Sequence, residues 1–347
     1  MNHQAIIPLE GASGEATIYR RMLMTKGQAT REAYATDLAD FARFLGLNSL
    51  ENLPDSAWHR LGTEHVAAYL ESLKTRINGA TGERLSTSTI ARRMAAVREL
   101  LKEAVLQGKW SQRKLDYVAS RLKPPQVTHQ HRPGITHEEQ VRILEAADAQ
   151  QGLKGARDYA LLRLWLDTGL RSAEVAALKT KDLMVREGQP VIIVRHGKGD
   201  RQREVGIEAY TAHVVQQWLS ESGQGRDENR PIFVWVRKFG RGEEAEYRVV
   251  NSEKHLSGVG LWMLVKRYAK AAGIESEISP HSFRVAWVTD SLNGGAPLRH
   301  VTAAGGWTTS AMPERIYDRG VWREPVSRYR KRALPRRKSN GHADQEE

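Results

Sequence analysis

Basic, histidine and tyrosine side chains recur in short segments of the C-terminal half that could together act on a phosphate group. The first segment, residues 167–175, reads DTGLRSAEV. Gly169 is typical of a helix end and Ser172 of a helix start, so we expect Arg171 at the joint between two helices. Glu174 lies three residues further on, close enough in a first helical turn to orient the guanidinium of Arg171. By itself, this segment also fits an ordinary pair of helices that carries a surface arginine.

Two further segments supply a lysine and a histidine–arginine pair. Lys198 lies within GKGD, residues 197–200, at the tip of a predicted hairpin where glycines allow a sharp bend. A lysine there could donate a proton to a leaving oxygen, or it could be a solvated turn residue. The serine–proline pair at 279–280 marks a helix start, which places His281 and Arg284 on one side of its positive end. This pattern predicts a phosphate pocket with a general acid or base beside it, and a capping histidine with an exposed arginine is the alternative.

The last segment combines a tryptophan with a tyrosine. Trp307 follows Gly305 and Gly306, and its indole N–H is a suitable donor to a phosphate oxygen. Tyr317 is predicted in a short polar helix among arginines. Neither residue is specific alone, because a tryptophan often serves simple packing and the chain has ten tyrosines.

The order of these segments resembles the tyrosine recombinases, the phage-integrase family, in a variant that carries tryptophan in the active site. The strings TGLRSAEV, GKGDRQREV and SPHSFR are close to those of the family, and the resemblance covers about residues 136–330. It implies a site-specific DNA recombinase that cuts and rejoins DNA through a 3′-phosphotyrosyl intermediate and a Holliday junction. The implied partners are double-stranded DNA with paired recombination sites, further copies of the chain in a homotetramer, and accessory DNA-bending proteins. No metal, ATP or other cofactor is implied.

The resemblance also implies how the phosphate would be attacked. Tyr317 would be the nucleophile, and it needs help because a free tyrosine has a pKa of about 10. Arg171 and Arg284 would hold the nonbridging oxygens and offset the charge of the transition state. Glu174 would position Arg171.

Three more roles follow from the same resemblance. His281 would assist proton transfer, Lys198 would protonate the 5′-oxygen, and Trp307 would donate its N–H to the phosphate or pack beside the nucleophile. Trp307 and Tyr317 are one residue further apart than is common in the family, so Tyr329 is the alternative nucleophile.

The elements that must position these residues are predicted to form a mainly helical, α+β protein with two domains, a C-shaped clamp around DNA. Strands are expected at 190–195 and 203–207, with 231–236 either a third strand or a buried loop. We predict a flexible N-terminal arm at 1–15, a helical, SAM-like DNA-binding domain at 16–122, a proline-rich linker at 123–135, the catalytic domain at 136–330 and a tail at 331–347.

Charge supports a nucleic-acid partner. The chain of 347 residues carries 53 lysines and arginines against 41 acidic residues, a net charge of +12, and the parts before and after residue 134 each carry +6. Excess positive charge on both parts suits a long polyanion, although it also occurs for solubility alone. The expected DNA-binding side chains are Arg92, Arg93, Arg98 and Lys102 on one helix, and Arg201 in the hairpin.

Composition excludes several classes of protein. The chain has no cysteine, which rules out disulfides, thiolate metal sites and cysteine nucleophiles. It has no run of about 18 apolar residues, which rules out a membrane span, so we expect a cytoplasmic protein associated with the nucleoid. Two alternatives stay open: a type IB topoisomerase-like nicking–closing enzyme, and a catalytically silent, sequence-specific DNA-binding regulator.

Overall fold

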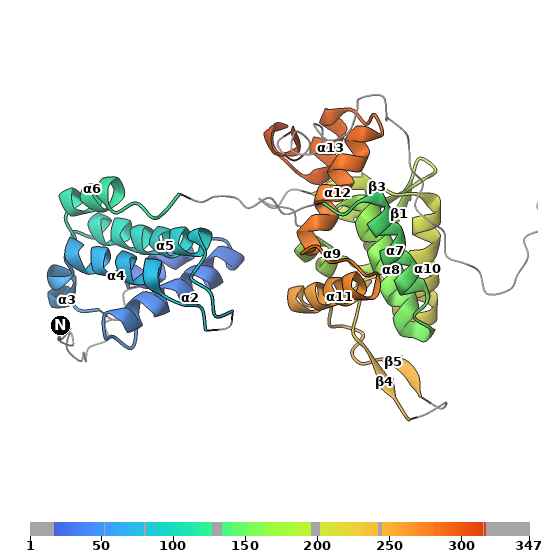
Figure 1. Ribbon diagram of the computed structural model, residues 1–347, viewed down its shortest axis with the longest axis horizontal. Coiled ribbons are helices and arrows are strands. Elements are labelled where there is room, and N and C mark those ends of the chain that lie inside the picture. Colours follow the sequence, from blue (N-terminus) through green and yellow to red (C-terminus); the bar gives the residue numbers. More distant parts are fainter. Residues whose placement is uncertain are drawn as a thin grey trace, which may run out of the picture. The chain divides into compact units, whose positions relative to one another are not determined.

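The chain forms two compact units, residues 1–130 and 131–347. A computed structural model describes residues 17–51, 53–79, 81–126, 134–195, 202–241, 245–314 and 316 (Figure 1). Among these residues, no helix is long and apolar enough to cross a membrane. Within the same ranges, no group of three or more His, Cys, Asp or Glu side chains is arranged to hold a metal ion.

The first unit is all-helical in its described residues, as predicted. Its helices are α1 (Ile18–Met24), α2 (Gln28–Phe44), α3 (Asp55–Arg60), α4 (Thr63–Thr75), α5 (Thr87–Leu106) and α6 (Gln112–Arg121). The Ser86 side chain caps α5 by accepting a hydrogen bond from the backbone N–H of Thr89. The apolar stripe of each helix lies in one shared core, in which the rings of Phe41 and Tyr69 pack 4.8 Å apart.

The second unit is mainly helical and contains two small antiparallel sheets. Its helices are α7 (His137–Asp148), α8 (Gly152–Thr168), α9 (Ser172–Ala177), η1 (Thr180–Asp182), α10 (Ala209–Ser222), η2 (Gln224–Arg226), α11 (Gly258–Ala271), α12 (Pro280–Asn293) and α13 (Leu298–Gly305). The strands β1 (Leu183–Arg186), β2 (Gln189–Val194) and β3 (Arg203–Gly206) form one sheet in that order, and β4 (Val236–Phe239) pairs with β5 (Glu246–Val249) in a separate hairpin.

Helix α8 is the centre of the second unit. It is buried on nearly all sides and packs against α7, α10 and α12 (Figure 1). Its buried charges are paired within the unit, as with Lys154 and Arg157, which both bond Asp158. Helix α7 begins at the predicted capping box, in which Thr136 and Glu139 exchange side-chain-to-backbone hydrogen bonds.

The predicted strands are confirmed, with additions. β2 and β3 are the two expected strands and pair with Val191 opposite Gly206. Residues 231–235 form a mostly buried loop with isolated strand-like bridges, and Val236 begins β4. The strands β1, β4 and β5 were not predicted. Each has only four residues, and each is exposed along half or more of its length.

Candidate active site

Arg171 and Glu174 form an ion pair at the joint between α8 and α9. Gly169 ends α8 with a left-handed backbone (φ 58°), and Arg171 is the N-cap of α9. Nη1 of Arg171 donates to Oε1 of Glu174 at 2.7 Å, and the backbone N–H of Arg171 donates to Oε2 at 2.9 Å. Glu174 is buried, whereas the Arg171 side chain is 30 % exposed. The carboxylate therefore fixes Arg171 and leaves part of its guanidinium open to solvent.

Arg203, the first residue of β3, is a second cation on Glu174 that sequence reasoning missed. Its Nη1 and Nη2 donate to the two carboxylate oxygens at 3.0 and 2.8 Å. Although burial raises the pKa of Glu174, the hydrogen bonds and charges of Arg203 and Arg171 outweigh it and hold that pKa below its ordinary value. The carboxylate is thus ionised and shared between two arginines. Its position directly after the predicted turn that holds Lys198 could have singled out Arg203. Its partner Glu174 lies 29 residues earlier, however, so no local pattern indicates the contact.

Arg284 on α12 is a buried cation held by backbone carbonyls. Its Nη1 donates to the carbonyl of Gly169 at 2.8 Å and its Nη2 to the carbonyl of Gly305 at 2.5 Å. Among the described residues, no carboxylate forms a salt bridge with it, and the residue is 3 % exposed. Burial, followed by repulsion from Arg171, lowers the pKa of Arg284 to about 9, so the group stays cationic at neutral pH.

Trp307 packs on Arg284 from the end of α13. The guanidinium carbon of Arg284 lies 3.9 Å from the ring centroid, a cation–π geometry. The preceding glycine at 305 is required by space, since a Cβ there would lie 1.9 Å from the Trp307 ring. The ring also packs on an apolar cluster that contains Val285, Val301 and Ile316. The tryptophan therefore lies beside Arg284, one of the two arginines that the resemblance implies for phosphate binding.

A core tryptophan, Trp165, supports both arginine-bearing segments. Its indole N–H donates to the carbonyl of Leu170 at 2.6 Å, directly before Arg171. Its ring stacks on that of Phe283, directly before Arg284, with centroids 5.3 Å apart. The end of α8 and the first turn of α12 are thereby packed on one buried side chain.

The other predicted site residues are placed only in part. His281 lies exposed in the first turn of α12, one turn before Arg284, and Pro280 begins that helix as predicted. Lys198, Arg201, Tyr317 and the alternative nucleophile Tyr329 lie outside the described residues. The structure therefore brings together Arg171, Glu174, Arg284 and Trp307.

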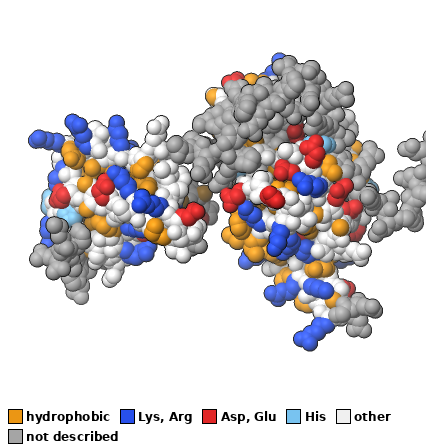
Figure 2. Space-filling model, viewed as in Figure 1, with side chains coloured by type: hydrophobic (Ala, Val, Ile, Leu, Met, Phe, Trp, Pro, Cys, Tyr) orange, Lys and Arg blue, Asp and Glu red, His pale blue; other side chains and the backbone are white. Residues whose placement is uncertain are grey.

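The cations predicted to bind DNA on α5 are already bonded within the first unit. Arg92 pairs with the buried Asp37 at 2.6 Å, and Arg93, whose side chain is 18 % exposed, pairs with Asp40 at 2.8 Å. Arg98 donates to the carbonyl of Met94, and Lys102 pairs with Glu99. Arg93 in particular stabilises the helix packing. Other lysine and arginine side chains lie exposed on both units in the view of Figure 2.

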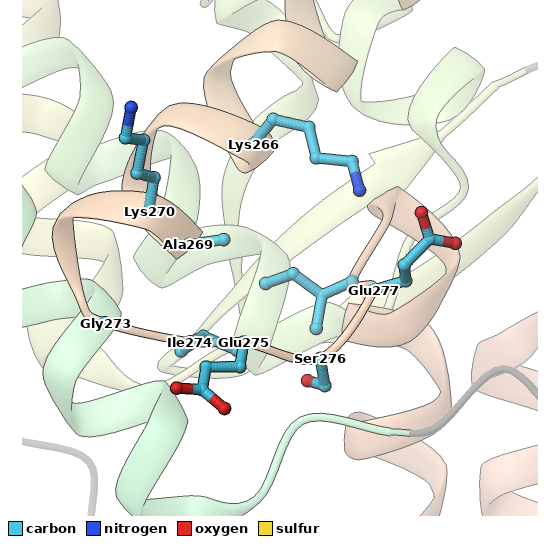
Figure 3. Close-up of a pocket in the computed structure, with 9 residues that line it drawn as sticks. Lys266, Ala269, Lys270, Gly273, Ile274, Glu275, Ser276 and Glu277 are labelled. Carbon is cyan, nitrogen blue, oxygen red and sulfur yellow. The ribbon is translucent and has the colours of Figure 1, made fainter. Parts of the chain in front are cut away.

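A separate shallow hollow lies at the C-terminal end of α11 (Figure 3). Its lining carries Lys266 and Lys270 together with Glu275 and Glu277. Two cations and two anions give no excess of positive charge for a phosphate. The arginine cluster is therefore the better candidate for a DNA phosphate site.

Comparison with known proteins finds two families along the chain. Residues 134–320 match the phage integrase family, and residues 18–108 match the phage integrase N-terminal SAM-like domain. The tyrosine recombinase XerD of Listeria innocua is 28% identical over 285 residues, which are 81% of this chain and 85% of that protein. The tyrosine recombinase XerC of Roseiflexus castenholzii is also 28% identical, over 83% of this chain and 82% of its own.

Solved structures share the fold. A lambda integrase tetramer bound to a Holliday junction superposes with a TM-score of 0.60 at 17% identity, covering 87% of this chain and 76% of that one. The XerH site-specific recombinase in a post-cleavage complex with a palindromic difH substrate gives a TM-score of 0.55 at 20% identity, covering 86% and 82%. At these identities the superpositions describe the architecture alone.

Proposed function

Because this chain belongs to the phage integrase family of tyrosine recombinases, we propose that it is a site-specific DNA recombinase that cuts and rejoins DNA through a covalent tyrosyl intermediate. One observation carries the proposal: Arg284 bonds the carbonyl of Gly169 and packs on Trp307, while Arg171, two residues after Gly169, is held by Glu174. Two guanidiniums and an indole are suited to the charge of a pentavalent phosphate, without a metal ion.

Tyr317 is the proposed nucleophile. Support comes from the preceding residue, Ile316, which is buried in the apolar cluster against which Trp307 packs. In the proposed step the phenolic oxygen forms a bond to phosphorus and the bond from phosphorus to the 5′-oxygen breaks. The 5′-oxygen leaves as a hydroxyl with a proton from Lys198, while His281 assists the proton transfer from the tyrosine.

The proposed assembly is a homotetramer on paired recombination sites. Support comes from the match to both family domains and from the similarity of the fold to a lambda integrase tetramer on a Holliday junction. We further propose that DNA-bending accessory proteins assist the complex and that it works on cytoplasmic, nucleoid DNA.

A covalent-trapping experiment tests the chemistry. The full chain is incubated, with EDTA and without ATP, with DNA from the flanks of its own gene that carries a nick, so that the cleaved fragment diffuses away. We expect a protein–DNA adduct on a denaturing gel in the wild type and in Tyr329→Phe, and none in Tyr317→Phe. An adduct that persists in Tyr317→Phe and disappears in Tyr329→Phe would assign the nucleophile to Tyr329.

The same preparation separates the two alternatives. Relaxation of any supercoiled plasmid without recombinant products would indicate a topoisomerase-like enzyme. Tight, sequence-specific binding without an adduct on any nicked site would indicate a regulator. Recombinant products between two copies of one mapped site, lost in Tyr317→Phe, are the outcome that the proposal requires.

A further inference from the structure

Arg203 links three separate segments of the second unit. Its two terminal nitrogens donate to Glu174 of α9, while its Nε donates to the carbonyl of Ala304, near the end of α13, at 2.7 Å. The side chain is only 10 % exposed. A guanidinium suits this task because its planar fork bonds both carboxylate oxygens and still has a donor on the third side.

The carboxylate of Glu174 is fully used by these contacts. Oε1 accepts from Nη1 of Arg171 and Nη1 of Arg203, and Oε2 accepts from the backbone N–H of Arg171 and Nη2 of Arg203. Without Arg203, each oxygen would keep one donor, both from Arg171. The carboxylate could then rotate, and the direction of the Arg171 guanidinium would rotate with it.

The far end of the contact reaches the second arginine and the tryptophan. Arg203 bonds the carbonyl of Ala304, and Arg284 bonds the next carbonyl, that of Gly305. Gly306 has a left-handed backbone (φ 67°), and a Cβ at this position would lie 2.9 Å from Nη1 of Arg203. The guanidinium therefore lies directly against the backbone that precedes Trp307.

We propose that Arg203 is a positioning residue for DNA cleavage, which fixes Glu174 and the end of α13 so that Arg171, Arg284 and Trp307 meet the scissile phosphate together. Arg203 itself does not touch the phosphate. The inference rests on the proposed function and adds a residue that acts through the others. A merely structural ion pair is the competing explanation, and the variants below distinguish it from a positioning role.

The test compares Arg203→Ala and Arg203→Lys with a matched control, Arg195→Ala. Arg195 follows β2 in the same sheet and pairs with the buried Asp182, and within the described part of the chain it makes no hydrogen bond to the arginine cluster. Each variant is checked for folding by thermal melting. Single-turnover cleavage of the nicked substrate is then measured at saturating DNA, together with the Kd for that DNA.

We expect Arg203→Ala and Arg203→Lys to slow cleavage by roughly 10²-fold, because a displacement of about 1 Å in a reacting group costs about that much. The Kd should change by less than about threefold, since the phosphate contacts are not removed. Arg195→Ala should melt at a lower temperature but cleave at the wild-type rate when folded. A folded Arg203→Ala protein that cleaves as fast as wild type, or no more slowly than Arg195→Ala, would overturn the proposal.

A double variant provides a second readout that a structural role would not give. If Arg203 acts partly through Arg171, then the rate loss in Arg171→Ala/Arg203→Ala should be smaller than the product of the two single losses. Rate losses that multiply would contradict that pathway. Absence of an adduct in the wild type would instead refute the proposed function, so the two failures are distinguishable.

Discussion

A methyl group added at Gly169 should lower both the stability of the protein and its rate of cleavage. Its backbone is left-handed (φ 58°), its carbonyl accepts from Arg284, and an added Cβ would lie 2.5 Å from two ring atoms of Trp287. Gly223 is a matched control because it ends α10 with a similar backbone (φ 70°), yet a Cβ there would meet its nearest neighbour, Arg226, at an ordinary 3.7 Å.

The two glycines share one energetic cost and differ in another. A left-handed backbone costs an alanine about 1–2 kcal/mol, and this applies to both positions. Overpacking against the half-buried ring of Trp287 adds about 1–3 kcal/mol, and this applies to Gly169 alone. We therefore expect Gly169→Ala to lose about 3 kcal/mol and Gly223→Ala about 1.5 kcal/mol. At about 2–4 °C per kcal/mol for a unit of this size, the melting temperatures should fall by roughly 6–12 °C and 3–6 °C.

Thermal melting of the full chain, followed by single-turnover cleavage below the melting range, checks both parts of the reasoning. Gly169→Ala should also cleave slowly, because its displaced carbonyl is a partner of Arg284, whereas Gly223→Ala should cleave at the wild-type rate. Equal losses of melting temperature in the two variants would show that the Trp287 ring moves aside without an energetic cost. Normal cleavage by a destabilised Gly169→Ala protein would disconnect the carbonyl from the site.

Three further outcomes follow from the contacts. In single-turnover cleavage, Trp307→Phe should keep most of the rate and Trp307→Ala should lose about tenfold or more, because Arg284 contacts the face of the ring. Equal losses in the two variants would assign the role to the indole N–H instead. Asp40→Asn should lower the free energy of unfolding of the first unit, measured in urea, by about 3 kcal/mol, since Tyr69 and Arg93 both donate to this carboxylate. The unfolding transition of the second unit should not change, and a change there would argue against independent units. Because the pKa of Glu174 is lowered in the fold, this carboxylate contributes its full stabilisation above the ordinary glutamate pKa of 4.5 and loses it as the pH falls below that value. The melting temperature should therefore fall more steeply in acid for wild type than for Glu174→Gln. Parallel curves for the two proteins would contradict this reasoning.

The site was predictable where its residues lie within one helical turn of each other. Arg171 and Glu174 are three residues apart and form the expected ion pair, whereas His281, three residues before the buried Arg284, lies exposed. The capping box at Thr136 and the proline that begins α12 are local in the same way. Local sequence patterns were therefore enough to predict the helices and the turns that bear the arginines.

What sequence reasoning missed depends on contacts between distant segments. Arg203 meets Ala304 across 101 residues, and no local pattern indicates that meeting. Likewise, the acidic partners of Arg92 and Arg93 lie on α2, more than fifty residues earlier, so these arginines looked like free cations. Charge counts along a chain do not show which charges are neutralised in the fold, and this is why the predicted DNA contacts on α5 need a direct test.

The carbonyls that hold Arg284 come from the C-terminal ends of two helices. Gly169 caps α8 and Gly305 is the last residue of α13. Helix C-termini carry a partial negative charge of about half an electron each, so two of them lower the cost of burying the cation. These partial charges belong to the backbone and cannot be displaced or protonated, unlike a carboxylate. In the proposed function, a phosphate bound by Arg284 would balance a cation that has no salt-bridge partner among the described residues, and DNA binding would thereby stabilise this unit.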